Sequence, residues 1–408
     1  MIGRRALLIL PVALVGAGLV AACGRDSGTP AVRPILILVS LDGWRADYTD
    51  RADAPNVRAL AARGVRSDAL IVAFPSKTFP NHYTTVTGLY PEHHGIVGNT
   101  MVDPAIPGRF TISSPVATDP RWWQGEPLWA TVQRQGRRAA SMFWPGSEVP
   151  GPGQPRDWIP YDGDLPNHAR VQQVIEWLAR PDAERPSFIT LYFSDVDSAG
   201  HDHGPDSAEV LAAAAALDRH VGDLVAGVAA LGLEARTTIL LTSDHGMSPG
   251  RADRAIYLDD YLELAAIDVI EWGPYASIAP NPGIDEACVH RAVIGRQPAM
   301  QVHRKAETPG HLHHRAHPRI PPILALADDG WIITTHGRVP SAGNHGYDPR
   351  VPSMRALLVV AGPDIRRGVV VAPIESVHLY EFMCRVLGVT PASNDGTRAA
   401  TSDWFEPR

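Results

Sequence analysis

Short runs of consecutive apolar residues recur along the chain, and longer segments marked by proline and glycine separate them. A run that is apolar on both faces is typical of a central strand in a parallel sheet. Such strands alternate with segments long enough for helices, which predicts βαβ units and an α/β fold with a mostly parallel central sheet. We predict strands over 35–41, 139–144, 187–193, 237–242 and 356–361. We predict helices over 55–63, 79–87, 127–135, 168–179, 208–231 and 376–387.

Two segments interrupt this alternation. Residues 99–129 are rich in proline, glycine and tryptophan, and we predict that most of them form a loop. Residues 260–338 carry many prolines and histidines, which indicates a small inserted subdomain or a cap. The rest of 34–408 is expected to form one domain around this insert, since a chain of 408 residues can bury a substantial core.

The N-terminus has the pattern of a targeting segment. Arg4 and Arg5 precede a short apolar stretch that ends in small residues, as in a secretory signal peptide over 1–23. The alternative is a transmembrane anchor, but the apolar stretch is short for a bilayer span. Val20-Ala21-Ala22-Cys23 resembles a bacterial lipobox, which would make Cys23 a lipidated first residue, and 24–33 would be a flexible tether. We therefore expect an exported protein that is either periplasmic, with or without a lipid anchor at Cys23, or secreted.

The composition narrows the classes of partner. The formal net charge is −7 and no long basic run is present, so an extended nucleic-acid surface is not expected. Besides Cys23 the chain has Cys288 and Cys384, which could pair in an oxidising compartment or remain free thiols. No CxxC pair exists, which disfavours a thiolate metal site.

Carboxylates and imidazoles follow several of the predicted strands. Taken singly, each could be a turn residue, a helix cap or a structural histidine. Together they are more informative, because ligands bind at the carboxyl ends of the strands in open α/β sheets. Carboxylate and imidazole ligands without thiolate suit zinc in a catalytic site, with manganese a weaker option. The candidate ligands are Asp42, Asp197, His201, Asp244, His245 and His345.

Thr78 lies just before the predicted helix 79–87. Threonine is a common N-cap residue, so Thr78 could serve only to begin the helix. A threonine hydroxyl can also be a nucleophile if a metal ion lowers its pKa, and the helix N-terminus suits a phosphate oxygen. The spacing alone leaves both interpretations open.

Several blocks of sequence resemble the nucleotide pyrophosphatase/phosphodiesterase family, the type I phosphodiesterases of the alkaline phosphatase superfamily. The resemblance is most specific around Thr78 and keeps the same order over nearly the whole mature chain. The blocks are 39–43 (VSLDG), 74–83 (FPSKTFPNHY), 87–96 (TGLYPEHHGI), 197–201 (DSAGH), 204–206 (GPD), 243–247 (SDHGM) and 343–348 (GNHGYD).

The resemblance implies an alkaline phosphatase-like three-layer sandwich whose catalytic domain, 34–408, holds two zinc ions. It also implies that Asn99 donates to a nonbridging phosphate oxygen, and that Phe79 and Tyr192 sandwich a nucleobase. Phe79 could instead pack its own helix, and Tyr192 could be a core strand residue. One zinc ion would be held by Asp42, Thr78, Asp244 and His245, and the other by Asp197, His201 and His345.

The implied activity is hydrolysis of phosphodiester or pyrophosphate bonds in nucleotides or other small phosphodiesters. Thr78 would form a covalent threonyl-nucleotide, and water would then release a nucleoside 5′-monophosphate. The alternatives on the same core are a phosphomonoesterase, a non-catalytic lipid-anchored binding protein, and a metal-dependent mutase or sulfatase. A sulfatase is disfavoured because position 78 is not Cys or Ser. A further group of histidines, expected at the rim rather than on the metals, comprises His311, His313, His314 and His317.

Overall fold

The computed structural model describes residues 2–3 and 33–407. The predicted signal peptide, Cys23 and the tether up to residue 32 lie outside the described residues. Among the helices that are described, none combines the length and the hydropathy that a membrane crossing requires.

Eight strands of the described chain form the central sheet. From edge to edge they are β19 (Val369–Val371), β2 (Val65–Ser67), β18 (Leu358–Ala361), β9 (Thr237–Thr242), β1 (Ile35–Leu41), β8 (Phe188–Phe193), β6 (Ala139–Met142) and β7 (Asp157–Ile159). β1 pairs in parallel with both β8 and β9, so it lies in the middle of the sheet. Within this sheet only β18 runs against the others, since it is antiparallel to β9 and to β2. The prediction of a mostly parallel sheet is confirmed.

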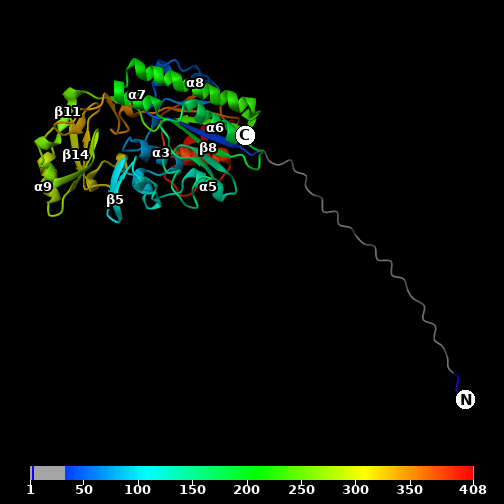
Figure 1. The fold of residues 1–408 in the computed structure, drawn as a ribbon, viewed down its shortest axis with the longest axis horizontal. Coiled ribbons are helices and arrows are strands. Elements are labelled where there is room, and N and C mark those ends of the chain that lie inside the picture. The colour runs from blue at the N-terminus through cyan, green and yellow to red at the C-terminus, as the bar shows by residue number, and fades with distance from the viewer. Residues whose placement is uncertain (1, 4–32, 408) are drawn as a thin grey trace. The chain divides into compact units, whose positions relative to one another are not determined.

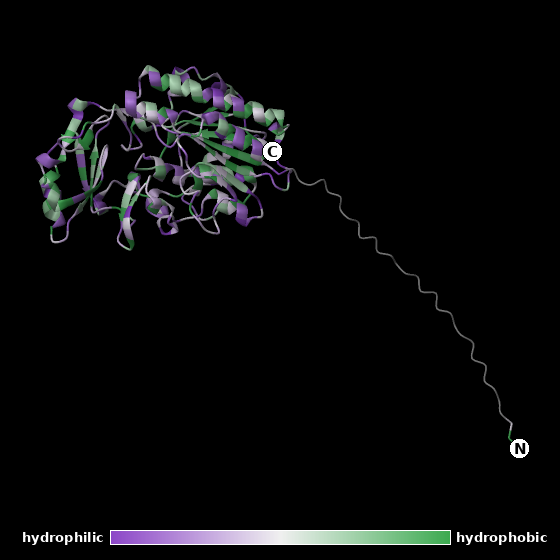
Figure 2. Cartoon of the chain, viewed as in Figure 1, coloured by the Kyte–Doolittle hydropathy of each residue, from purple (hydrophilic) through white to green (hydrophobic). Residues whose placement is uncertain are grey.

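The two faces of β1 are buried in two separate cores. Leu36 and Leu38 belong to one apolar cluster, while Ile37, Val39 and Leu41 belong to the other. Successive side chains of a strand point to opposite faces, so both faces of the sheet must be covered. Figure 2 shows these inner strands as the most apolar part of the domain. This is the reason that β1 reads as a continuous apolar run and not as an alternating one.

Helices cover each face and complete a three-layer sandwich (Figure 1). On one face lie α2 (Pro55–Ala62), α6 (Asn167–Leu178) and α8 (Ala208–Ala230), whose buried residues join the cluster of Ile37. On the other lie α3 (Thr78–Thr87), α5 (Leu128–Arg134) and α10 (His378–Leu387), whose buried residues join the cluster of Leu38. The α/β three-layer architecture expected from the sequence is confirmed.

Between β9 and β18 the chain forms a separate four-stranded antiparallel sheet with its own apolar core. Its strands are β12 (Ile267–Glu271), β13 (Tyr275–Pro280), β15 (Ile323–Ala327) and β14 (Met300–Arg304), and α9 (Glu286–Val293) packs on them. Figure 1 shows this sheet at one end of the domain, next to the hairpin β4 (Thr100–Asp103) and β5 (Ile106–Thr111). The insert boundaries 260–338 stay a prediction.

The remaining elements are short. The helices are α1 (Tyr48–Arg51), α4 (Pro91–His94) and α7 (Asp195–His203). The strands are β3 (Leu70–Ile71), β10 (Ser248–Pro249), β11 (Ala255–Tyr257), β16 (Ile332–Thr334), β17 (Gly343–Asn344) and β20 (Ile374–Glu375).

Two local features differ from the pattern-based expectation. The segment 99–129 contains the hairpin β4–β5 in addition to loop, and β4 of this hairpin contacts β12 of the insert, which gives the two short strands a surface to pack on. Cys288 is exposed and Cys384 is buried, and both are free thiols, so of the two alternatives for these cysteines the free form is found.

Helix α2 has its N-terminus capped by a residue of another helix. The Asp218 carboxylate, on α8, accepts hydrogen bonds from the backbone N–H groups of Asn56 and Val57 at 3.1 and 2.8 Å. The helix's own N-cap residue, Ala54, has no side chain that could do this. Asp218 therefore joins α8 to α2 by satisfying donors that the helix start leaves open.

We predict that Asp218→Ala lowers the free energy of unfolding by about 2 kcal/mol, because two buried amides lose a charged acceptor. Asp223→Ala is the matched control, since Asp223 lies on the same helix with a side chain 64% exposed. The control should stay within about 0.5 kcal/mol of the parent in denaturant titrations. Equal losses in both variants would show that the cap contributes nothing.

Candidate active site and metal centre

The candidate ligands meet at one edge of the central sheet. β8, β1 and β9 are adjacent and parallel, so their carboxyl ends open to the same side. Asp42 follows β1 directly, Asp244 and His245 follow β9, and α7 begins just after β8. Residues 343–348 reach the same edge of the sheet because β17 pairs with β10, which follows His245 in the sequence. Ligands that are far apart in the sequence are thereby brought together.

Asp42, Asp244 and His245 form what we call the first ligand group. The Nε2 atom of His245 lies 3.1 Å from Oδ2 of Asp244 and 3.4 Å from Oδ1 of Asp42. All three side chains are almost completely buried. Thr78 lies next to this ligand group, because its Oγ1 is 3.5 Å from the Nε2 atom of His245.

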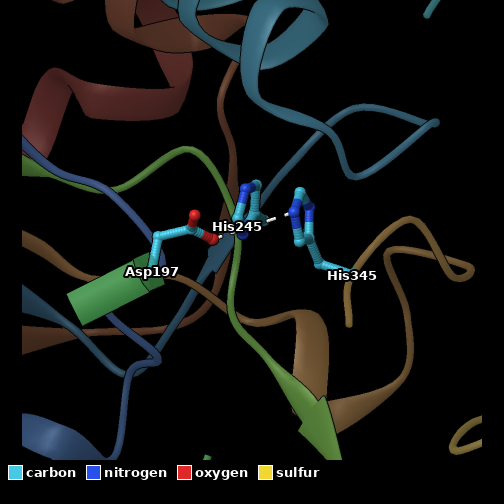
Figure 3. A group of neighbouring side chains, drawn as sticks. All are labelled: Asp197, His245 and His345. Carbon is cyan, nitrogen blue, oxygen red and sulfur yellow. Dashed lines mark ion pairs between the residues drawn. The ribbon is translucent and has the colours of Figure 1, made fainter. Parts of the chain in front are cut away.

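Asp197, His201 and His345 form the second ligand group. Asp197 and His201 lie one turn apart on α7, with Oδ1 and Nε2 separated by 3.4 Å. The Nε2 atom of His345 is 3.2 Å from that of His201 and 3.7 Å from Oδ1 of Asp197. His245 borders both groups, since its ring stacks on that of His345 at 3.5 Å between centroids (Figure 3). One ligand atom each from Asp197, His245 and His345 also lie within 4.8 Å of one another.

The three histidines are oriented in the same way. Each Nδ1 atom lies 2.8–2.9 Å from a backbone carbonyl oxygen: His201 from Gly343, His245 from Gly246 and His345 from Ser76. A carbonyl oxygen can only accept, so Nδ1 carries the proton and donates. The Nε2 atom of each ring is therefore left with a lone pair that points into the cluster. This arrangement is common for histidines that ligate a metal.

The cluster has an excess of electron-pair donors and a deficit of positive charge. Oδ1 of Asp42, Oδ1 of Asp197 and Oδ2 of Asp244 are buried and accept no hydrogen bond from the described residues. Burial, together with the carboxylates of Asp244 and Asp197, raises the pKa of Asp42 well above its usual value. Burial and then Asp197 raise the pKa of Asp244 to about 8. Burial and the neighbouring His245 hold the pKa of His345 well below its ordinary value, so it cannot supply a positive charge.

Two divalent cations would resolve this imbalance. Unpaired carboxylate oxygens and inward-facing imidazole lone pairs are the donor set that such a cation takes, and a buried anion otherwise neutralises itself by protonation. Two sets of ligand atoms lie close enough together for one cation each, Asp42–Asp244–His245 and Asp197–His245–His345, and His201 lies 3.4 Å from Asp197 beside the second set, so the cluster fits a binuclear metal centre. Imidazole and carboxylate ligands suit zinc and also suit manganese.

Thr78 is the first residue of α3. The loop that leads to it is held by Asn81, whose side-chain amide donates to the carbonyl oxygens of Ala73, Pro75 and Lys77. Its Oδ1 accepts from the backbone N–H of Ala73 at 2.7 Å. Thr78 is therefore not a free N-cap residue but a hydroxyl fixed at a helix start, facing the first ligand group.

His82 also holds the start of α3 in place. It lies one turn after Thr78, with its Nδ1 2.8 Å from the Thr78 carbonyl oxygen and its Nε2 2.8 Å from Oγ of Ser40. Burial lowers the pKa of His82 to about 3, so the ring is neutral and serves as a spacer between β1 and α3. The sequence patterns did not mark Asn81, His82 or Ser40; the positions of Asn81 and His82 at i+3 and i+4 from Thr78 were the available signal, and Ser40 lies on the distant strand β1.

Asn99 lies beside the N-terminus of α3. Its Oδ1 accepts a hydrogen bond from the backbone N–H of Phe79 at 3.0 Å. Because the carbonyl end of the amide is used in this way, the NH₂ end is left to donate to another group. This orientation is the one that a donor to a phosphate oxygen requires.

The aromatic residues near the site have different surroundings. The ring of Phe79 is partly buried and packs on Phe110 and Trp123. Tyr192 donates its hydroxyl proton to Oδ2 of Asp42 at 2.6 Å, so it holds the carboxylate of a candidate metal ligand. Tyr161, which the sequence patterns did not single out, is 55% exposed and its ring lies against that of Tyr192. Its neighbours make it a third aromatic candidate for binding substrate.

The histidine-rich segment has partners of its own. His311 pairs with Asp348 at 2.8 Å, and His313 stacks on Tyr90. His314 is buried against Phe74, while His317 is buried near Arg319. None of the metal-type groups found among the described residues includes them.

Comparison with known proteins gives concordant matches. The family described as type I phosphodiesterase/nucleotide pyrophosphatase matches residues 36–348. The chain is 35% identical to the venom phosphodiesterase of Macrovipera lebetinus, over 90% of this chain and 44% of that protein. It is 36% identical to the bovine bis(5′-adenosyl)-triphosphatase, over 94% of this chain and 84% of that protein. The chain thus spans less than half of the first relative and most of the second.

A solved structure has the same fold. Murine ectonucleotide pyrophosphatase/phosphodiesterase 5, in an inactive threonine-to-alanine variant in complex with AMP, superposes with a TM-score of 0.88 at 32% sequence identity. The match covers 92% of this chain and all of that one.

The raised pKa values predict how stability depends on pH when no metal is bound. Asp244 has a pKa of about 8 in the folded chain and 3.8 as its ordinary value. Between these values the folded protein holds a proton that the unfolded chain has released, so stability is greatest below about pH 4 for this group and falls as pH rises through 8. Buried histidines with lowered pKa values, among them His82 and His345, act in the opposite sense, so we expect the chelator-treated parent to lose melting temperature relative to Asp244→Asn between pH 5 and pH 8.

Saturating zinc or manganese should raise the melting temperature and remove this fall, because the cation replaces the proton on the carboxylates. Asp244→Asn is the reference, since it lacks this titrating group and keeps the buried histidines. A metal-free parent whose melting temperature does not fall relative to Asp244→Asn over this interval would contradict the assignment of a buried, unpaired carboxylate.

Proposed function

The chain belongs to the type I phosphodiesterase/nucleotide pyrophosphatase family of hydrolases, in the alkaline phosphatase superfamily, and we propose that it hydrolyses phosphodiester or pyrophosphate bonds in nucleotides. The observation that carries this proposal is the position of Thr78. Thr78 lies at a helix start with its Oγ1 3.5 Å from Nε2 of His245, and in the same ligand group Oδ1 of Asp42 and Oδ2 of Asp244 accept no hydrogen bond from the described residues. The AMP complex of the murine relative supports a nucleotide as the ligand of this fold.

Each residue of the site has a role in a two-step transfer. Oγ1 of Thr78 attacks phosphorus and gives up its proton, the bond to the leaving oxygen breaks, and a threonyl-nucleotide forms. Water then attacks the same phosphorus, Oγ1 leaves and takes back a proton, and a nucleoside 5′-monophosphate is released. Two cations, for which we propose zinc, would lower the pKa of the hydroxyl and neutralise charge on the phosphate when bound. Their ligands would be Asp42, Thr78, Asp244 and His245 for one, and Asp197, His201 and His345 for the other.

The chain's own groups supply the remaining stabilisation. The NH₂ group of Asn99 and the open backbone N–H groups at the start of α3 are available to the nonbridging phosphate oxygens. Tyr192 keeps the Asp42 carboxylate in place through its hydroxyl. These donors are fixed before substrate arrives, which is how such groups favour the transition state over the ground state.

The charge balance favours a diester over a monoester. A phosphomonoester carries more negative charge than a diester and needs additional cationic donors. Lys77 is the cation next to the nucleophile, and its charge is opposed by the nearby Glu271. A non-catalytic binding protein would have no need for an activated hydroxyl beside two ligand groups.

The predicted signal peptide indicates where the protein acts. We propose that the protein is exported, with residues 1–23 as the signal peptide and lipidation of Cys23 as the possible membrane attachment. The substrate would then be an extracytoplasmic nucleotide or another small phosphodiester.

We predict that Thr78→Ala lowers kcat for thymidine 5′-p-nitrophenyl phosphate by at least about 10³-fold, because the attacking oxygen is removed. Thr85→Ala is the matched control: Thr85 lies on the same helix and its hydroxyl only donates to the Asn81 carbonyl oxygen. The control should keep its activity, and mass spectrometry of quenched parent enzyme should find a nucleotidyl adduct on Thr78.

The same assay separates the proposed activity from its main alternative. The parent should cleave the nucleotide ester faster than p-nitrophenyl phosphate, in a reaction that a chelator stops and zinc restores. Faster cleavage of the simple monoester would favour a phosphomonoesterase. Full activity of Thr78→Ala would refute the covalent mechanism.

Phe79, Tyr161 and Tyr192 are the proposed contacts of the nucleobase. We predict that Tyr161→Ala and Phe79→Ala each lower kcat/KM for the nucleotide ester. The loss in transition-state stabilisation calculated from kcat/KM should be about 1–3 kcal/mol, the energy of stacking one base on an aromatic ring. Methyl p-nitrophenyl phosphate, which has no base, should be affected much less. Tyr161→Phe keeps the ring and should retain the parent's preference for the nucleotide ester over the methyl ester. If the alanine variants lose equal activity on both substrates, the rings do not bind the base.

A further inference from the structure

The insert reaches the phosphate-binding part of the site through one acidic residue. Glu271 is the last residue of β12, and the register of the β12–β13 pair shifts between Val269 and Glu271. Such a bulge redirects a side chain away from the regular alternation. The Oε2 atom of Glu271 accepts a hydrogen bond from the backbone N–H of Thr100 at 2.7 Å, across 171 positions of sequence.

Thr100 directly follows Asn99, so this contact acts on the residue that we assign to the phosphate. Asn99 is held through its side chain by the N–H of Phe79, and the next residue, Thr100, is held by Glu271 and by its pairing with Thr111 in the β4–β5 hairpin. The contact with Glu271 is the one that fixes the backbone N–H directly after Asn99, so without it the NH₂ group of Asn99 would be less precisely directed.

The turn and the carboxylate are packed in direct contact. A Cβ atom added to Gly98 would lie 3.3 Å from Oε2 of Glu271, 3.2 Å from the hydroxyl oxygen of Tyr275 and 2.9 Å from the carbonyl oxygen of Thr100. Tyr275 is fully buried in the small apolar cluster of Phe74, which gives the carboxylate a rigid backing. Only glycine therefore allows the backbone to approach Glu271 so closely.

Glu271 also interacts with the residue before the nucleophile. Burial raises the pKa of the Glu271 carboxyl, while Lys77 and the Thr100 amide lower it. The same attraction opposes the lowering of the Lys77 pKa that burial causes. One carboxylate of the insert thus contacts or attracts both segments that carry substrate-facing groups, 77–79 and 98–100.

We propose that Glu271 is a positioning residue for Asn99, through which the insert holds the amide donor against the phosphate. This inference rests on the proposed function of Asn99. Because Asn99 would donate most strongly to charge that develops during transfer, losing its orientation should lower kcat more than it raises KM.

We expect Glu271→Ala to lower kcat on the nucleotide ester about tenfold, a part of the roughly 10²-fold or greater loss typical for removing such a donor altogether. KM should change by less than about twofold. Glu271→Gln keeps an oxygen that can accept from Thr100, so it should retain at least about half of the parent's kcat. A loss in the glutamine variant as large as in the alanine variant would place the role in the charge opposite Lys77 and overturn the proposal.

A double-mutant cycle with Asn99→Ala gives the decisive comparison. If Glu271 acts through Asn99, Glu271→Ala should change kcat by less than about twofold in the Asn99→Ala background. A full tenfold loss in that background would contradict the proposal. Asp259→Ala is the matched control, because Asp259 is another acid of this segment that accepts backbone and hydroxyl hydrogen bonds, from His336 and Thr335. It should leave kcat unchanged, even if it lowers the melting temperature.

Orthovanadate binding tests the inference independently of turnover. Vanadate imitates the five-coordinate phosphorus of the transfer, and calorimetry measures its affinity without a reaction. Its dissociation constant should rise by about the same tenfold factor in Glu271→Ala and remain near the parent value in Glu271→Gln and Asp259→Ala. A parent that binds vanadate but cleaves no diester would refute the proposed function alone. Unchanged vanadate binding in Glu271→Ala would refute the role of Glu271 alone.

Discussion

The mutual repulsion of buried carboxylates is the constraint on which the site depends. Asp42 and Asp244 are almost fully buried, Asp197 lies beside them, and each has an oxygen without a hydrogen-bond donor. Such an arrangement is costly in a folded protein unless protons or cations neutralise it. The histidines do not relieve it, because their Nδ1 protons are committed to backbone carbonyl oxygens and their lone pairs point inward. The donors and the charge of the cluster therefore fit a binuclear metal centre.

The fold supplies this constraint from ordinary elements. Three adjacent parallel strands end at one edge of the sheet, and each is buried on both faces, so the loops that follow them have little freedom to move apart. The helix α3 brings Thr78 to the same edge, where Asn81 and His82 hold it. The second sheet adds a contact from outside the sandwich, through Glu271. The chemistry we propose requires all three of these supports: the strand ends, the helix α3 and the second sheet.

Much of this could be predicted from the sequence. The apolar runs marked the strands because a central parallel strand has no solvated face, and the ligands followed because strand ends of this fold share an edge. The reversed direction of β18 within the central sheet could not be predicted, since a short buried run looks the same in either direction. The helical setting of Asp197 and His201 was also missed, although their i, i+4 spacing is the spacing of one helical turn.

Residues that act through tertiary contacts were beyond sequence reasoning. Tyr192 was expected to stack on a base, and its hydroxyl bond to Asp42 depends on the parallel pairing of β8 with β1. Glu271 lies in the segment 260–338, which the sequence marked only as an inserted subdomain or a cap, and its partner is 171 positions away. Tyr161 is an exposed aromatic residue in a loop, with no periodic pattern to mark it. In each case the role follows from packing between segments, which local pattern does not encode.

Anomalous diffraction at the zinc absorption edge, from crystals of the zinc-saturated protein, tests the central claim most directly. The account predicts two strong peaks a few ångströms apart, one among Asp42, Asp244 and His245 and the other among Asp197, His201 and His345. A single peak, or peaks that lie away from these two ligand groups, would contradict it.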